Sequence, residues 1–149
     1  MNTKRLSKIG GAWWLAGLLS VGGFGTAYAH HVIVDTDYVL KNKDKPGVVL
    51  VDARGAADYK KGLIPGAAVL GEKPGQVTLR DVNARVLPVK KLEKILGEAG
   101  ITRENEIIVY GTKGDTGPDV VFWILEYLGA GKAKVYHGGF DDWTAGKHP

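Results

Sequence analysis

Two short runs of consecutive apolar residues constrain the fold of this chain more than any other feature. The sequence reads VVLVDAR over residues 48–54 and EIIVY over residues 106–110, and neither run alternates between apolar and polar residues. Strands of this kind are covered on both faces, as in the middle of a parallel sheet. Helical segments lie between them, so the sequence predicts an α/β domain with a central, mostly parallel sheet flanked by helices.

The segments around these strands carry further predictions. Residues 87–100 (LPVKKLEKILGEAG) predict a helix with Pro88 in its first turn. Residues 117–131 (GPDVVFWILEYLGAG) predict a helix that is apolar nearly all round and therefore packs deep in the domain. The polar residues 71–86 are expected to form an irregular surface loop, and residues 132–143 a short strand, a double-glycine turn and a tryptophan.

The first 29 residues have the pattern of a secretory signal peptide. Lys4, Arg5 and Lys8 form a positive region, the apolar run AWWLAGLLSVGGF follows, and Ala27–Ala29 fits a small-residue cleavage site. The apolar run is shorter than the roughly 20 residues needed to cross a bilayer. The pattern therefore favours a cleaved signal peptide over a membrane anchor.

Cleavage after Ala29 would leave one domain of residues 30–149, exported to the periplasm or secreted, with no membrane association. Loss of the three positive charges takes the formal net charge from +4 to about +1. The basic balance of the whole chain is therefore mostly a targeting feature, and nucleic acid is not expected as a partner.

The chain contains no cysteine. A thiolate nucleophile, a thiolate metal site and a redox-active cysteine pair are therefore all excluded. No cofactor and no metal site are expected. In open α/β sheets, ligands bind beyond the carboxyl ends of the strands, which draws attention to Asp52–Gly55 and Gly111–Gly117.

Five segments, taken in order, resemble the rhodanese homology domain, a family of sulfurtransferases. They read VVLVDAR (48–54), YKKGLIPGA (59–67), LPVKKLEKILGEAGI (87–101), IIVYG (107–111) and WILEYLGAGKAKVYHGGFDDWTAGKHP (123–149). The resemblance covers nearly all of residues 30–149. It implies a three-layer rhodanese-like fold, with Leu63 at a position where histidine is usual in the family.

The resemblance also implies that the catalytic group is missing. Active members of the family have a loop of the form Cys-x-x-Gly-x-Arg, in which the cysteine carries a persulfide cradled by loop amides. Here the glycine is matched by Gly114, but Gly111 stands at the cysteine position and Thr116 at the arginine position. No catalytic residue is therefore assigned. The candidate loop comprises Gly111, Thr112, Lys113, Gly114, Asp115 and Thr116.

This loop has two interpretations. A glycine-rich turn at a helix N-terminus presents free amides, and Lys113 adds positive charge, so the loop could hold a small sulfur-containing anion. Asp115 and Asp119 oppose this, since they lie at the same helix end and would complement its dipole themselves. By resemblance, Asp52 and Arg54 form a structural pair that supports the loop from beneath.

The resemblance extends to the amino-terminal half of tandem sulfurtransferases, which also lacks the cysteine. Residues 71–86 are longer than the equivalent segment in many single-domain members, and the chain stops after Gly146–Pro149, where a second domain would follow. Two readings stay open: a freestanding inactive domain with a protein partner, and the truncated support half of a tandem enzyme that pairs with a second rhodanese domain.

An enzyme of another class is the remaining alternative. The segment VIVDTDYV resembles the motif of haloacid-dehalogenase phosphatases, with Asp35 as nucleophile, Asp37 as general acid and Asp141–Asp142 as magnesium ligands. The competing structural interpretation is that Asp35 caps a short helix.

Overall fold

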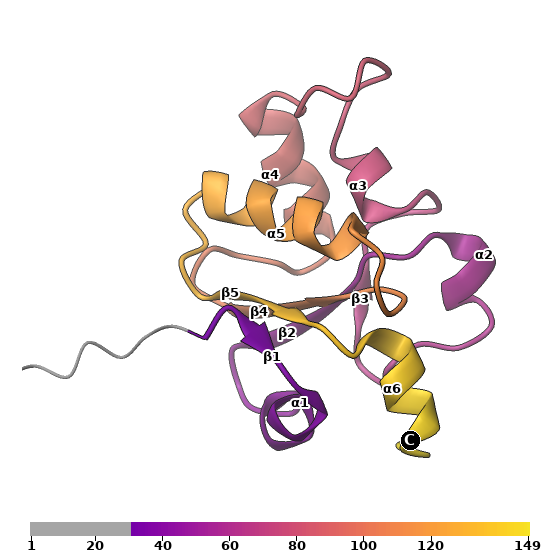
Figure 1. The fold of residues 1–149 in the computed structure, drawn as a ribbon. Helices are drawn as coiled ribbons and strands as arrows, with labels where there is room; N and C mark the ends of the chain where they lie inside the picture. Colours follow the sequence, from indigo (N-terminus) through magenta and orange to yellow (C-terminus); the bar gives the residue numbers. More distant parts are fainter. Residues whose placement is uncertain (1–30) are drawn as a thin grey trace, which may run out of the picture.

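The computed structural model describes residues 31–149 and shows a three-layer α/β domain (Figure 1). Its sheet has the strand order β1-β5-β4-β2-β3, and every neighbouring pair of strands is parallel. The strands are β1 (Ile33–Val34), β2 (Val48–Asp52), β3 (Ala68–Val69), β4 (Glu106–Tyr110) and β5 (Ala133–Tyr136). The predicted fold class is confirmed. The predicted signal peptide lies outside the described residues.

The two apolar runs form the centre of the sheet, as their sequence predicts. Strands β2 and β4 pair along their whole length, from Val48 opposite Glu106 to Asp52 opposite Tyr110. Both strands are covered on both faces, which explains why their apolar residues are consecutive. Because β2 and β4 are parallel, Asp52 and the loop after Tyr110 emerge at the same edge of the sheet.

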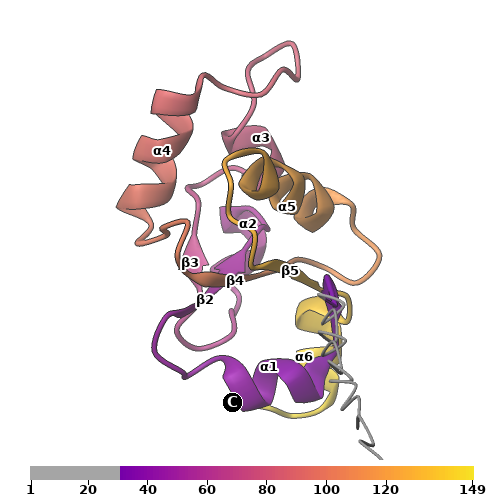
Figure 2. The same cartoon turned by 90° about the vertical axis from the view of Figure 1, so that its left-hand side faces the viewer.

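Helices cover both faces of the sheet (Figures 1 and 2). One face carries α3, α4 and α5, while α1 and α6 lie against the other and α2 stands beside the β3 edge. The helices are α1 (Thr36–Asn42), α2 (Ala56–Tyr59), α3 (Gly75–Thr78), α4 (Val89–Glu98), α5 (Gly117–Tyr127) and α6 (Gly139–Ala145). Each face has its own apolar core, so the sheet is buried between two clusters of side chains.

The predicted helix over residues 87–100 is confirmed as α4, with Pro88 as its N-cap residue. Most of residues 71–86 is irregular and exposed, as predicted, but the prediction missed the short helix α3 within this segment. Gly75 and Leu79 are buried there, and Gly75 fits closely because a Cβ at its position would lie 2.9 Å from Val121 Cγ2. The tight contact between α3 and α5 therefore orders a stretch whose composition indicates a loop.

The prediction that α5 is buried all round was also wrong. Val121, Ile124 and Leu125 are buried, but Trp123 and Tyr127 are exposed. Only one side of α5 faces the sheet, and apolar composition alone does not show which side that is. The double-glycine turn after β5 is the start of a helix, α6. No helix among residues 31–149 is long and apolar enough to cross a bilayer.

Candidate functional site

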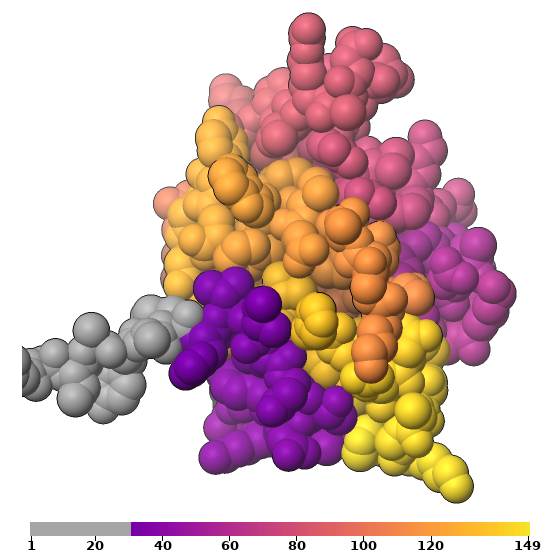
Figure 3. Space-filling view, in the orientation of Figure 1, coloured from indigo at the N-terminus to yellow at the C-terminus, as the bar shows by residue number. Residues whose placement is uncertain are grey.

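Two groups of residues meet at the carboxyl edge of the sheet. The first, called the Asp52 network here, consists of Asp52, Arg54 and Tyr110. The second is the β4–α5 loop, residues 111–116. This loop lies on the surface beside the start of α6 (Figures 1 and 3). Tyr110 ends β4 and the loop follows directly, so the two groups are adjacent in space as well as in sequence.

The Asp52 network is buried and held together by charge-assisted hydrogen bonds. Arg54 Nη2 donates to Asp52 Oδ2 at 2.6 Å, and Arg54 Nε donates to Asp52 Oδ1 at 2.9 Å. Tyr110 Oη donates to Asp52 Oδ2 at 2.9 Å and accepts from the Ile64 N–H at 3.1 Å. A bidentate pair with this many partners can keep a carboxylate charged without water.

The network raises the pKa values of Arg54 and Tyr110. Burial alone would lower the pKa of Arg54, but its hydrogen bonds with Asp52 and the charge of Asp52 raise it above its ordinary value. Burial, and then the negative charge of Asp52, raise the pKa of Tyr110. These two shifts keep the Arg54 guanidinium charged and the Tyr110 phenol neutral.

Phe140 connects the Asp52 network to the loop. The Arg54 guanidinium lies 4.0 Å from the centroid of the Phe140 ring, which is the geometry of a cation–π contact. The backbone N–H of Phe140 donates to the carbonyl of Gly111 at 2.8 Å. One residue at the start of α6 therefore positions both the buried pair and the first residue of the loop.

Gly139 allows α6 to approach the loop backbone. Its φ angle is +59°, a conformation that residues with a side chain rarely adopt. A Cβ on Gly139 would lie 2.5 Å from the Gly111 carbonyl oxygen and 3.1 Å from the Lys113 nitrogen. Only glycine fits here without displacing the loop.

Carboxylates of the chain itself accept from two amides, one in the loop and one at the start of α5. The Lys113 N–H donates to Asp141 Oδ2 at 2.7 Å, and the Gly117 N–H donates to Asp115 Oδ1 at 3.0 Å. Lys113 Nζ pairs with Asp142 Oδ1 at 2.8 Å, and this hydrogen bond raises the pKa of Lys113. The Lys113 and Gly117 amides thus bind carboxylate oxygens, as expected for Gly117 at a helix N-terminus, but these carboxylates belong to the chain itself.

The position of Gly111 leaves little room for a side chain. A Cβ built there would lie 2.7 Å from Pro118 Cγ and 3.7 Å from Asp115 Oδ2. The proline ring at the start of α5 therefore fills the space that a side chain at residue 111 would enter. A cysteine in this place would require Pro118 to move and would face a carboxylate.

The structure brings together every site residue that the sequence singled out by resemblance. Gly111 is buried, the loop residues 112–116 are exposed, and Asp52 and Arg54 form the expected structural pair. Sequence reasoning did not anticipate the roles of Tyr110, Phe140 and Asp141. The segment GGFDD contained a usable signal, since a glycine pair beside acidic residues fits a close approach to backbone amides.

Three of the four residues of the phosphatase alternative, Asp35, Asp141 and Asp142, have structural contacts. Asp35 caps α1 by accepting from the Tyr38 N–H at 2.9 Å. Asp141 and Asp142 are engaged with Lys113 through its backbone and side chain. Among residues 31–149, no group of three or more histidine, aspartate or glutamate side chains is arranged to hold a metal ion. No finding favours this alternative.

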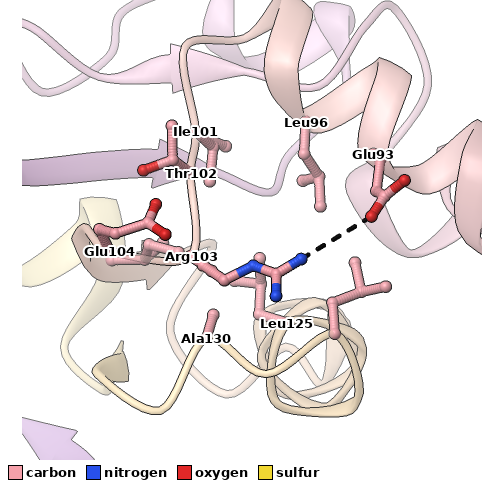
Figure 4. Close-up of a pocket in the computed structure, with 10 residues that line it drawn as sticks. Glu93, Leu96, Ile101, Thr102, Arg103, Glu104, Leu125 and Ala130 are labelled. Carbon is pink, nitrogen blue, oxygen red and sulfur yellow. Dashed lines mark ion pairs between the residues drawn. The ribbon is translucent and has the colours of Figure 1, made fainter.

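A separate hollow lies at the opposite end of β4, between α4, α5 and the segment before β4 (Figure 4). It measures about 270 Å³ and has apolar walls that include Leu96, Ile101 and Leu125. Arg103 extends across it toward Glu93, with 3.9 Å between Nη2 and Oε1. Because this hollow is at the amino edge of the sheet, it takes no part in the site described above.

Fold and site together define a parallel α/β domain with a glycine-rich loop at the carboxyl edge of its central strand. Residues 35–146 match the rhodanese-like domain family. The chain is 31% identical over 104 residues to a thiosulfate sulfurtransferase of Azotobacter vinelandii, and 33% identical over 115 residues to one of Pseudomonas aeruginosa. The chain therefore belongs to the rhodanese-like domain family.

These matches cover 70% and 76% of this chain but only 38% and 42% of the two relatives. The chain thus spans about two-fifths of the length of the curated relatives it matches. The anaerobic ergothioneine biosynthesis enzyme of Chlorobium limicola has a similar structure, with a TM-score of 0.69 and 20% identity. That likeness covers 79% of this chain and 31% of the enzyme, and it shows the fold alone.

Proposed function

We propose that this chain is an exported rhodanese-like domain that has no sulfurtransferase activity of its own and acts as a binding or partner domain. The observation that carries the proposal is the identity of residue 111, which is a glycine. Persulfide chemistry needs a thiolate, and a glycine stands at the position that the family resemblance assigns to the cysteine. Pro118 crowds the space into which a side chain would extend.

The remaining features of the site support a structural role for the loop. Internal carboxylates satisfy the amides of Lys113 and Gly117, and the Lys113 ammonium is paired with Asp142. A loop closed in this way keeps its shape without a ligand. The match covers only 38% and 42% of the two relatives, which supports a second form of the proposal: a support half that works beside a catalytic domain.

The decisive assay is thiosulfate:cyanide sulfurtransfer with the purified protein. We expect no turnover above a heat-inactivated sample, and a cysteine-containing thiosulfate sulfurtransferase is the positive control. Turnover that copurifies with the protein and survives further purification would overturn the proposal. Export is tested separately, by mass spectrometry of the material outside the cytoplasm, where an N-terminus at His30 is expected.

A weak anion site in the loop is the second candidate function, favoured by one observation. The loop amides do bind carboxylate oxygens, so their geometry suits an oxyanion. An external anion such as thiosulfate must displace Asp115 or Asp141, so we expect millimolar affinity at best. Asp115→Asn should strengthen binding, because it removes the opposing charge nearest to Gly111 and Gly117.

NMR titration of the amides of residues 111–117 with thiosulfate measures this directly, with chloride at equal ionic strength as the control. If the amides shift more in Asp115→Asn than in the wild type, the loop is a masked anion site. If neither protein responds, the loop is a structural turn and only the partner-domain role stands.

A further inference from the structure

The exposed side of α5 carries two large aromatic side chains. Trp123 is 74% exposed and Tyr127 is 68% exposed. Residues four apart on a helix lie on one stripe, so the two rings are neighbours on the same face. Tryptophan and tyrosine are enriched at protein interfaces, where they bury a large apolar area at a small cost in side-chain entropy.

A groove runs beside this aromatic stripe. It measures about 520 Å³ and lies between α5 and the segment of residues 80–86. Ala84, Val86, Val120 and Ile124 contribute apolar lining. The groove is therefore an apolar hollow with two apolar rings standing at its side, which allows one copy of the surface to present rings to the hollow of another.

The edge of the groove carries one charge of each sign. Arg80 and Asp119 both line it, and neither forms an ion pair with any residue in the described part of the chain. The Arg80 guanidinium contacts Gln76, with Nε donating to the Gln76 carbonyl at 2.6 Å. A face with unpaired charges of both signs is complementary to itself, whereas a face with a single sign would repel its own copy.

We propose that this face, formed by Arg80, Val86, Asp119, Trp123 and Tyr127, is the interface of a two-fold symmetric dimer of this chain. In such an interface the same patch is used on both copies, so each Trp123 enters the partner's groove. Each Asp119 then lies opposite the Arg80 of the partner. The inference does not depend on whether the β4–α5 loop is catalytic, because the dimer interface is tested by oligomeric state and not by sulfurtransfer.

Sedimentation equilibrium of the full chain tests the proposal. We expect a monomer–dimer equilibrium in the wild type, and a loss of affinity of at least about 30-fold in Trp123→Lys, as for a central interface residue. Leu40→Lys is the matched control, because it places the same charge at an exposed apolar residue of α1, on the other face of the sheet. This control should dimerise like the wild type.

Charge reversal gives a second, independent test. Asp119→Arg and Arg80→Asp should each weaken the dimer, because each places like charges opposite one another. The double variant should recover most of the lost affinity, since it restores the pair in reversed order. Thermal unfolding of each variant checks that the fold is intact.

Three results would overturn the proposal. The first is a monomeric wild type at millimolar concentration. The second is equal association of the wild type, Trp123→Lys and Leu40→Lys, which would place the contact elsewhere on the chain. The third is a double charge variant that is no tighter than the single variants.

Discussion

The Asp52 network and the β4–α5 loop lie side by side at one edge of the sheet, yet they should differ in how well they tolerate substitutions. Asp52 is fully buried and exchanges hydrogen bonds with Arg54 and Tyr110, so each group depends on the others. The loop residues 112–116 are exposed, and water can replace any contact that they lose. The buried network is a requirement of folding, whereas the exposed loop can change its chemistry while the fold persists.

This difference gives a physical reason why the proposed loss of the nucleophile would leave the fold intact. Removing one member of a buried ion pair leaves an uncompensated charge in a medium that solvates it poorly. Changing an exposed loop residue carries no such penalty. The buried Asp52 network is therefore expected to tolerate substitution less well than the exposed loop.

The largest expected effect is in the Asp52 network. Arg54→Ala should lower the free energy of unfolding by about 3–5 kcal/mol, because it strands the buried Asp52 carboxylate. Urea unfolding at pH 7 measures this loss. Arg54→Lys is the matched control, since it keeps the charge but loses the bidentate geometry. Its free energy of unfolding should lie between those of the wild type and Arg54→Ala. A loss below 1 kcal/mol in Arg54→Ala would contradict the comparison.

The next effect concerns the contact between α6 and the loop. Gly139→Ala should cost about 2 kcal/mol, because it combines a positive φ angle with a Cβ that meets the Gly111 carbonyl. Gly97→Ala in α4 is the control, since nothing lies within 4 Å of its Cβ. That substitution should raise stability by about 0.5–1 kcal/mol. If Gly139→Ala and Gly97→Ala change the unfolding temperature equally, the loop can shift to accommodate a Cβ at residue 139.

A pH-dependent effect tests the contribution of Tyr110 to the network. Tyr110 keeps its proton in the folded state above its ordinary pKa of 10.0, whereas the unfolded chain releases it, so stability is lost as the pH rises past 10. Tyr38, whose pKa is raised to about 12 by burial and by its hydrogen bond to Glu106, acts in the same direction. Tyr110→Phe should cost about 1–2 kcal/mol at pH 7.

The same variant should lose stability less steeply than the wild type between pH 10 and 11, by up to about 1.4 kcal/mol for each pH unit. Urea unfolding at pH 7, 9, 10 and 11 measures both effects, and Tyr127→Phe on the exposed side of α5 is the control. Identical pH profiles of the wild type and Tyr110→Phe would show that Tyr110 is not the titrating group.

The smallest effect is expected in the loop. Lys113→Ala should leave the unfolding midpoint unchanged within error, because the pair with Asp142 is exposed and the backbone bond from the Lys113 N–H to Asp141 remains. Thermal unfolding at low and high salt checks this. A shift of the unfolding midpoint as large as that of Gly139→Ala would mean that the loop tolerates substitution as poorly as the network beneath it.

The sequence by itself determined the layers of the domain and the identity of the loop. The consecutive apolar residues of β2 and β4 are typical of strands in the middle of a sheet, and the order of five motifs indicated the family. The absence of a thiol is also a fact of sequence. Local composition and spacing were enough for these conclusions because they depend on which residues are present.

Only the tertiary structure decided which groups fill the loop and which side of α5 is covered. Asp141 reaches the Lys113 amide across 28 residues of sequence, and Pro118 crowds Gly111 because α5 turns back over the end of β4. The exposure of Trp123 and Tyr127 depends on how α5 rotates to fit against α3 and the sheet. These features follow from the packing of distant segments, and packing is a property of shape that no local pattern of residues encodes.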